Sequence, residues 1–249
     1  MGFWKEMVPD RRHWVIDIGN TRIKLGIFNQ GKLLESSTLA DFASLVPKIK
    51  PGDRDKMLIA SVTWTEEALR EEIAYPFLFF DQHTPLPIRN EYQSPGTLGL
   101  DRLAAVMGAR AFEPIGPVLC IDLGTCITYD FLDGENVYKG GAISPGLGLR
   151  SKAMNAYTAR LPLVEVPQQT PPFLGKDTVG CIQSGIYYGI LGEMKEYIHR
   201  FTAAYGQVNV FICGGDAEIF ESLTKDHIFV IPNLVLYGLD RILTYNVEK

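Results

Sequence analysis

One short phrase occurs twice in this chain, and it constrains the fold more than any other feature. Residues 15–21 read VIDIGNT, and residues 120–126 read CIDLGTC. Each copy is an apolar strand ending in Asp-x-Gly-polar, and a second strand and another polar turn follow, over 22–32 and 127–136. A glycine in such a turn permits positive φ and lets the backbone approach a ligand closely. Two such turns, each with a carboxylate at its base, are suited to contacting one polyphosphate from two sides. The first hypothesis is an ATP-dependent phosphotransferase.

Composition limits the alternatives. The 249 residues are 46% hydrophobic and 21% charged, which is typical of a globular protein with one large core or two modest ones. The net charge is −5, and no basic run exceeds Arg11-Arg12, so we expect no nucleic-acid surface. No uncharged apolar run approaches the ~18 residues of a membrane span. The first 14 residues lack a signal-peptide core, so we expect a cytoplasmic protein with no membrane partner.

The cysteines and histidines show no metal-ligand spacing. The four cysteines contain no Cys-x-x-Cys pair, and the four histidines are scattered. We therefore expect reduced core cysteines and no zinc site.

The order of elements predicts a duplicated α/β fold. In the first half we expect strands at 14–18, 22–28, 33–38, 57–62 and 77–80, helices near 40–49, 65–74 and 98–112, and a proline-containing loop over 81–97. In the second half we expect three strands over 117–144, a strand at 208–213, and helices at 149–158, 178–205, after 216 and at 234–245. Pro114, Gly116 and Pro117 place the domain boundary between 1–115 and 116–249. Three-stranded meanders followed by alternating strands and helices, twice over, would leave a cleft between the halves.

Four glycines in the predicted long helix need an explanation. Gly180, Gly185, Gly189 and Gly192 each cost ~1 kcal/mol relative to alanine in a helix interior. Such a cluster indicates a close approach of another backbone. Packing against the chain's own sheet and a helix–helix contact between two copies remain equally open.

The general base of a hydroxyl-phosphorylating enzyme should be a carboxylate close to the transferred phosphate. Gly-Leu-Asp-Arg occurs twice, at 99–102 and at 238–241. The first copy opens a helix directly after a glycine-containing loop, and a helix start is a natural anion site. The second lies in an amphipathic closing helix, where we interpret Asp240 and Arg241 as a structural, solvated pair. We therefore choose Asp101 and expect Asp240→Asn to be nearly silent.

The remaining candidates lie in the turns. Asn20, Thr21 and Thr125 offer donors to phosphate oxygens, and Lys24 offers a cation. Asp17 and Asp122 would repel phosphate, so their plausible use is to hold a metal ion or its waters. Gly214-Gly215-Asp216 joins a strand to a helix and resembles a nucleotide-contacting turn, although a single Gly-Gly pair is weak evidence.

Together these motifs resemble the type III pantothenate kinases over essentially the whole chain. They appear in the order typical of that family: segment 17–24, Tyr92 with 99–102, segment 122–125 and segment 214–216. The resemblance implies ATP-dependent phosphorylation of pantothenate, the first step of coenzyme A biosynthesis, in a cytoplasmic homodimer. It also implies membership of the acetate-kinase, sugar-kinase, Hsp70 and actin superfamily. The fold implied is two duplicated actin-like (ribonuclease-H-like) domains, each a mixed sheet with helices, with the ATP cleft between them.

The resemblance further implies residue roles. Asp101 would be the proton acceptor, Asp17 would lie near Mg²⁺, and Asp122 would bind an activating monovalent cation, K⁺ or NH₄⁺. The implied pantothenate-binding positions are Tyr92, Gly99, Leu100, Asp101, Arg102 and Thr178. The implied nucleotide-binding positions are Asp17, Ile18, Gly19, Asn20, Thr21, Arg22, Ile23, Lys24, Thr125, Gly214 and Gly215.

The family pattern has one departure, and two other functions remain open. Cys126 stands where the second turn commonly has alanine, which makes this position a candidate for oxidation sensitivity. The first alternative is another small-molecule kinase of the same superfamily, since the ATP turns are widely shared. The second is a non-catalytic regulatory accessory factor. Intact Asp17, Asp101 and Asp122 argue against the second.

Overall fold

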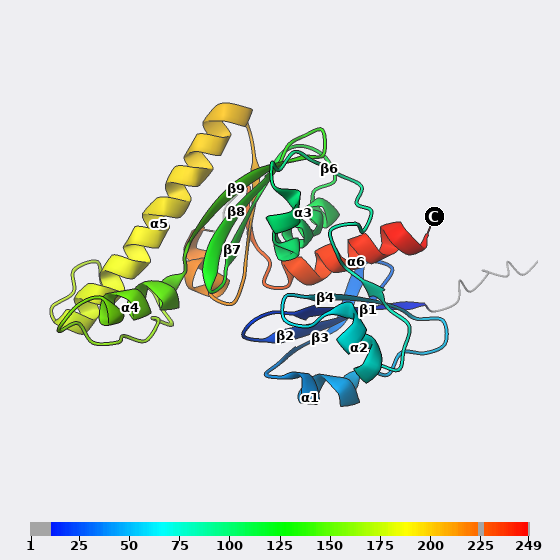
Figure 1. Cartoon of the computed structure of the whole chain (residues 1–249). Coiled ribbons are helices and arrows are strands. Elements are labelled where there is room, and N and C mark those ends of the chain that lie inside the picture. Colours follow the sequence, from blue (N-terminus) through cyan, green and yellow to red (C-terminus); the bar gives the residue numbers. More distant parts are fainter. Residues whose placement is uncertain (1–10, 224–226, 249) are drawn as a thin grey trace, which may run out of the picture. The chain divides into compact units, whose positions relative to one another are not determined.

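The computed structural model describes residues 11–223 and 227–248. The chain forms two compact units (Figure 1). The first unit contains Met1–Pro87, Gly96–Ala111 and Val235–Lys249, and the second contains Ile88–Pro95 and Phe112–Leu234. The last described residues, 235–248, therefore belong to the first unit. The single division into 1–115 and 116–249 stays a prediction. It was drawn from one proline- and glycine-containing stretch of the sequence, whereas each compact unit contains segments that are distant in the sequence.

The first unit is built on a five-stranded sheet in the order β3-β2-β1-β4-β5. Its strands are β1 (Arg12–Ile18), β2 (Ile23–Asn29), β3 (Lys32–Leu39), β4 (Lys56–Ser61) and β5 (Leu78–Phe79). β1 pairs antiparallel with β2 and parallel with β4. β1 lies at the centre of the sheet, and its residues 13–16 are all buried. Because successive side chains point to opposite faces, both faces of β1 are covered.

The second unit contains a six-stranded sheet in the order β11-β10-β7-β8-β9-β6. Its strands are β6 (Arg89–Asn90), β7 (Val118–Leu123), β8 (Cys126–Leu132), β9 (Val137–Pro145), β10 (Asn209–Cys213) and β11 (Ile228–Val230). β7 pairs antiparallel with β8 and parallel with β10. The uninterrupted loop predicted over 81–97 was wrong, because Arg89 and Asn90 form a short parallel strand with β9.

The two sheets confirm the duplication. Each unit contains a three-stranded antiparallel meander, and the first strand of the meander also pairs in parallel with a later strand. Asp17 and Asp122 occupy matching places, each one residue before the end of its strand. Asp17 lies opposite Lys24 and Asp122 lies opposite Thr128. The repeat in the sequence is thus a repeat in the backbone.

The helices follow the predicted order with shifted ends. They are α1 (Phe42–Leu45), α2 (Glu66–Glu72), α3 (Leu100–Phe112), α4 (Leu147–Ala156), α5 (Thr178–Tyr205) and α6 (Leu234–Val247). The helix expected after Asp216 is a 3₁₀ segment, Ala217–Leu223. The Asp177 side chain caps α5 by accepting a hydrogen bond from the Gly180 N–H, and Gly206 ends the helix at φ +78°. Among the described helices, none is long and apolar enough to cross a membrane.

The glycines of α5 do not pack closely on the chain's own sheet. A methyl group placed at Gly185 or Gly192 would meet nothing within 4 Å, and one at Gly189 would meet only the Arg150 side chain, at 3.7 Å. Gly180 faces its own capping region, where the nearest atom belongs to Asp177. Of the two interpretations, packing against the sheet does not account for Gly185 or Gly192. A contact with a second copy stays a prediction.

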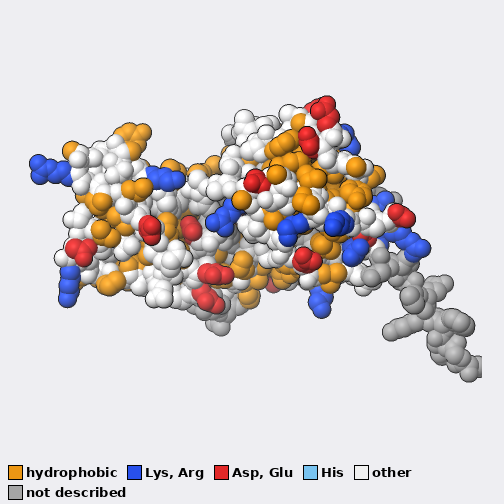
Figure 2. Space-filling view, turned by 90° about the horizontal axis from the view of Figure 1, so that it is seen from below, with side chains coloured by type: hydrophobic (Ala, Val, Ile, Leu, Met, Phe, Trp, Pro, Cys, Tyr) orange, Lys and Arg blue, Asp and Glu red, His pale blue; other side chains and the backbone are white. Residues whose placement is uncertain are grey.

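The surface mixes both signs of charge. Figure 2 shows one face, on which Lys and Arg side chains alternate with Asp and Glu side chains and with apolar groups.

Two helices of the first unit cross at Gly238. A Cβ atom at this position of α6 would overlap the backbone carbonyl of Ala104 in α3 and would lie 2.9 Å from the Gly108 nitrogen. Figure 1 shows the two helices side by side at this crossing. Gly238 therefore belongs to the core, and only a residue without a side chain fits there.

Asp240 corrects the interpretation of the second Gly-Leu-Asp-Arg copy as a solvated pair. Asp240 is only 4% exposed, and its Oδ1 lies 2.8 Å from Nδ1 of His13 in β1. Arg241, its neighbour, is exposed as expected. The reason is that α6 is buried on more than one face, since Gly238 and Leu239 are buried as well. Asp240 is structural, but it links α6 to the central strand instead of facing solvent.

This correction changes the expected result for Asp240→Asn. The variant should lose about 1–2 kcal/mol of the free energy of unfolding, because an amide accepts a weaker hydrogen bond from the imidazole than a carboxylate does. Urea denaturation of the two proteins measures the difference, and Arg241→Ala serves as the exposed neighbouring control. Equal midpoints for Asp240→Asn and the parent protein would show that the buried pair contributes nothing.

Candidate active site

The first turn joins β1 to β2. The Gly19 N–H donates to the Arg22 carbonyl oxygen at 3.1 Å, and a Cβ at Gly19 would lie 3.2 Å from that oxygen. The tip residues Asn20, Thr21 and Arg22 are exposed. Since Asp17 and Lys24 are directly opposite each other across the strands, their side chains project from the same face of the sheet. The turn thus combines a carboxylate, an ammonium group and accessible polar tip residues.

The second turn has the same construction. The Gly124 N–H donates to the Cys126 carbonyl oxygen at 3.1 Å, and Thr125 and Cys126 are exposed at the tip. This result corrects the expectation of core cysteines, because Cys126 and Cys181 are exposed while Cys120 and Cys213 are buried. Cys126 is exposed because the tight turn places it where the strand has only begun.

A third segment joins the second turn at Gly214. This residue follows β10, which pairs with β7, and its φ is +99°. A Cβ at Gly214 would lie 2.5 Å from Oδ1 of Asp122 and equally close to the Leu123 backbone. The Asp216 N–H donates to the Leu123 carbonyl oxygen at 3.0 Å, and burial raises the pKa of the Asp216 carboxyl. The second unit therefore brings Asp122, the second turn and the Gly214–Asp216 turn together.

The first Gly-Leu-Asp-Arg copy starts α3 in the first unit. Asp101 is exposed at the first turn of the helix, and its Oδ1 accepts a hydrogen bond from the Arg102 N–H at 2.9 Å. A Cβ at Gly99 would meet the end of the Asp101 side chain, so the carboxylate would have to shift from its present position. Arg102 is only 5% exposed, in contrast to Asp101. The segment thus presents one carboxylate to solvent and directs the following cation inward.

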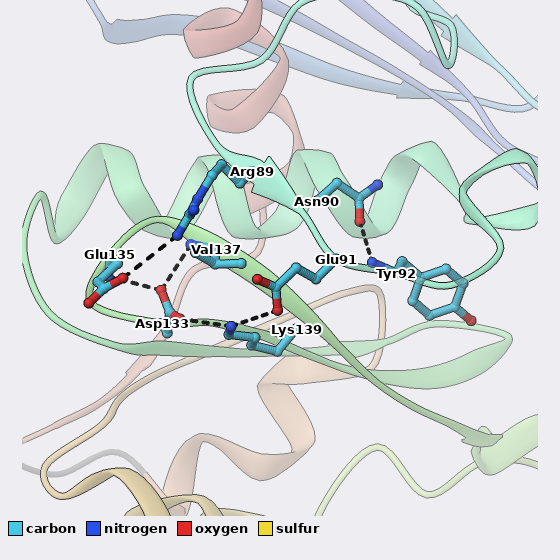
Figure 3. Close-up of polar contacts among 8 residues, drawn as sticks. All are labelled: Arg89, Asn90, Glu91, Tyr92, Asp133, Glu135, Val137 and Lys139. Atoms are coloured by element: carbon cyan, nitrogen blue, oxygen red, sulfur yellow. Dashed lines mark hydrogen bonds and ion pairs between the residues drawn. The ribbon is translucent and has the colours of Figure 1, made fainter.

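Tyr92 lies in the second unit, just after β6 (Figure 3). Its N–H donates to Oδ1 of Asn90 at 2.9 Å, and its ring packs on Gly140, where a Cβ would lie 3.3 Å from the ring. Lys139 contacts Glu91 at 2.7 Å and Asp133 at 3.4 Å, which ties the strand before Tyr92 to β9. Figure 3 shows the Tyr92 ring projecting away from these ion pairs.

Thr178 is the first residue of α5, in the second unit, and is exposed. The predicted pantothenate-binding residues are therefore divided between the units, with Tyr92 and Thr178 in the second and residues 99–102 in the first.

Sequence reasoning missed two supports of these residues. One is the Glu91–Lys139 ion pair, which joins segments that are distant in sequence. The other is Gly146, whose N–H donates to the Thr125 carbonyl oxygen at 3.1 Å and where a Cβ would lie 2.7 Å from that oxygen. The Pro145-Gly146 dipeptide was visible as a turn, but its contact with Thr125 depends on the pairing of β8 with β9.

Comparison with known proteins identifies the family. The family model described as type III pantothenate kinase matches residues 14–200. A curated type III pantothenate kinase from Cytophaga hutchinsonii is 40% identical over 94% of this chain and 99% of its own length. One from Bacteroides fragilis is 41% identical, over 93% and 97%. The chain belongs to the type III pantothenate kinase family.

Solved structures confirm the fold expected for a member of this family. A Campylobacter jejuni protein described as a Baf family transcriptional activator aligns with a TM-score of 0.63 at 21% identity, covering 95% of this chain and all of that one. Ethanolamine utilization protein EutJ from Carboxydothermus hydrogenoformans aligns with a TM-score of 0.53 at 13% identity, covering 95% and 91%. At these identities the likeness shows the fold alone, which is the duplicated actin-like fold.

Proposed function

We propose that this type III pantothenate kinase family member transfers the γ-phosphoryl group of ATP to the primary hydroxyl of pantothenate, the first step of coenzyme A biosynthesis. The observation that carries the proposal is the identity of about 40% to curated type III pantothenate kinases over nearly the whole chain. The two glycine turns and the exposed Asp101 at the start of α3 supply the groups that this reaction needs.

The proposed mechanism assigns the chemistry to few residues. Asp101 accepts the proton of the pantothenate hydroxyl as its oxygen attacks the γ-phosphorus, and ADP leaves with the electrons of the broken P–O bond. The exposed tips at 20–22 and 125–126 hold phosphate oxygens, and Lys24 offsets their charge. Tyr92, Gly99, Leu100, Arg102 and Thr178 contact pantothenate. Phosphoryl transfer depends mainly on positioning and electrostatic stabilisation, which this distribution of groups supports.

The carboxylates near the turns fit the two cations that the proposal includes. Among the described residues no group of three or more His, Cys, Asp or Glu side chains could hold a metal ion. Mg²⁺ does not need such a group of side chains, because it is usually bound through one or two carboxylates together with substrate phosphates and water. Asp17 would serve this role, and bound Mg²⁺ would neutralise charge on the phosphates. Asp122 lies beside the backbone at Leu123 and Gly214, so it would hold K⁺ or NH₄⁺ among oxygen atoms.

The Asp122 assignment predicts a dependence on the monovalent cation. Turnover of the parent protein should fall when sodium replaces potassium, since the proposal assigns Asp122 to K⁺ or NH₄⁺. Asp122→Asn should have low turnover in both buffers, with the difference between them lost. Rates measured at saturating ATP and pantothenate test this. A parent protein equally active in both buffers, or a variant that keeps the potassium preference, would remove Asp122 from the role.

The protein is further proposed to act as a homodimer. Support comes from apolar side chains exposed at and before the start of α5: Phe173 is 70% exposed, Leu174 75% and Val179 44%. Gly185, on the same helix, faces open space within its own chain. Clustered apolar groups of this kind are typical of a protein–protein interface. Sedimentation velocity should show a species of twice the chain mass, and a monomer at micromolar concentration would contradict the proposal. The cytoplasmic location stays a prediction.

The experiment for the proposed function is ADP release with ATP and Mg²⁺, with and without pantothenate. Release should require pantothenate, and glucose or acetate in its place should give the background rate. Release that is stimulated by another acceptor and not by pantothenate would assign the chain to a different kinase activity of the same fold. No acceptor-dependent release would favour a regulatory role.

A further inference from the structure

A polar network in the second unit joins two helices to two strands. Nη2 of Arg150, in α4, lies 2.6 Å from Oε2 of Glu193, in α5, and donates to Oγ of Ser144 at 2.9 Å. Oε1 of Glu193 accepts a hydrogen bond from the Tyr129 hydroxyl at 2.8 Å, and the Ser144 hydroxyl donates to Oε2 at 3.1 Å. The side chains of Arg150 and Glu193 are only 22% and 24% exposed. The Glu193 carboxylate thus has three side-chain donors.

The network is connected to the second glycine turn through Pro145 and Gly146. Nε of Arg150 donates to the Pro145 carbonyl oxygen at 2.8 Å. The next residue, Gly146, donates its N–H to the Thr125 carbonyl oxygen at 3.1 Å and has no space for a side chain against the Gly124–Thr125 backbone. Pro145 also lies opposite Cys126 in the β8–β9 pairing. A continuous series of contacts therefore leads from Glu193 to the backbone of Thr125.

The charges keep this network in one state near neutral pH. Burial raises the pKa of Glu193, but the hydrogen bonds from Arg150, Tyr129 and Ser144 together lower it by more. The pKa of Glu193 therefore lies below its ordinary value. Burial and the Glu193 contact raise the pKa of the Tyr129 hydroxyl, so it remains a donor. A partly buried and fully hydrogen-bonded pair of this kind is costly to break, because the remaining charge loses its partner.

We propose that Arg150 is a positioning residue that holds the second glycine turn in its phosphate-binding geometry, and that Glu193 fixes the guanidinium for this purpose. This inference rests on the proposed function, since it takes Thr125 as an ATP contact. Arg150 is connected to the turn through the Pro145–Gly146 backbone, and Glu193 acts by holding Arg150. The predicted effect is therefore on ATP and not on pantothenate.

The test separates the two substrates. Arg150→Ala should raise the KM for ATP about tenfold or more, since displacement of a positioning element is felt strongly by the bound substrate, while the KM for pantothenate changes less than about twofold. Arg150→Lys keeps the charge but loses the fork that reaches Pro145, Ser144 and Glu193 together, so it should recover only part of the ATP affinity. Glu193→Gln should shift the KM for ATP in the same direction by a smaller factor.

Matched controls test whether the effect belongs to this network. Arg200→Ala removes another arginine that pairs with a glutamate of α5, Glu196 at 2.7 Å, but the two side chains are 74% and 56% exposed. Its KM for ATP should equal that of the parent. The Arg150→Ala/Glu193→Ala double variant should lose no more ATP affinity than Arg150→Ala alone, because both residues act in one series. Additive losses would contradict the proposal.

Direct binding separates failure of this inference from failure of the proposed function. The Kd for MgATP is measured by calorimetry with the parent and Arg150→Ala, without pantothenate. If the parent binds MgATP but does not phosphorylate pantothenate, the proposed function fails while weaker binding by the variant still supports Arg150. Unchanged MgATP affinity in Arg150→Ala overturns the inference. Parallel losses for both substrates, with a lower melting temperature, overturn it as well, since they show a general structural role.

Discussion

Asp101→Asn is expected to reduce kcat by about 10²–10⁴-fold, the range that general-base catalysis supplies. The substitution keeps the shape of the side chain and can still accept a hydrogen bond from the Arg102 N–H, so the start of α3 should be preserved. An amide cannot take the proton of the attacking hydroxyl. The KM for pantothenate should change little, because the loss falls on the transition state.

The control for this variant is Asp240→Asn, the same change in the second Gly-Leu-Asp-Arg copy. Asp240 is buried against His13, so its substitution should lower stability while the kcat per folded molecule stays near that of the parent. Steady-state rates and circular dichroism of both variants give the comparison. Comparable activity of Asp101→Asn and the parent would exclude Asp101 as the base, and a selective loss in Asp240→Asn would assign the role to the other copy.

Gly238→Ala is expected to give the largest loss of stability. The added methyl group would overlap the Ala104 carbonyl, so α6 must move away from α3 in a region where Leu239 is fully buried. Overpacking a close crossing of this kind costs about 1–3 kcal/mol or more, because backbone atoms cannot rotate away as side chains do.

Gly148→Ala is the matched control, since it adds the same methyl group to another helix. At that position the methyl group would meet only a Val166 methyl, at 3.8 Å, which is ordinary contact. Its stability should equal or slightly exceed that of the parent, because alanine has the higher helix propensity. Thermal denaturation of the three proteins tests this. A Gly238→Ala protein as stable as Gly148→Ala would show that the α3–α6 crossing adapts without cost.

The sequence predicted best what is encoded by neighbouring residues. The strands around Asp17 and Asp122 are marked by unbroken apolar runs that end in glycine turns, and both meanders are confirmed. The start of α3 near Asp101 was also predictable from neighbouring residues, because a glycine-containing loop directly precedes a segment with helical spacing. The roles of these residues were predicted from the family resemblance, because hydrophobic periodicity does not indicate them. The family itself is confirmed.

What the sequence could not show depends on contacts between distant segments. β6 consists of two residues in a polar, proline-containing stretch, and it exists because β9 offers a free edge. The sequence around Asp240 has a pattern typical of a solvated helix face. In the structure, however, Asp240 of α6 contacts His13 of β1, which is 227 positions away in the sequence. Arg150 and Glu193 look like ordinary surface charges on two helices, and only the fold brings them to the second turn.

Transfer of the label from γ-³²P-ATP tests most directly whether this chain moves a phosphoryl group from ATP to pantothenate. The protein is incubated with labelled ATP, Mg²⁺, potassium and pantothenate. The products are then separated, and their masses are determined by mass spectrometry. We expect labelled phosphopantothenate from the parent protein and almost none from Asp101→Asn. Label that remains in ATP, or appears only as inorganic phosphate, would contradict it.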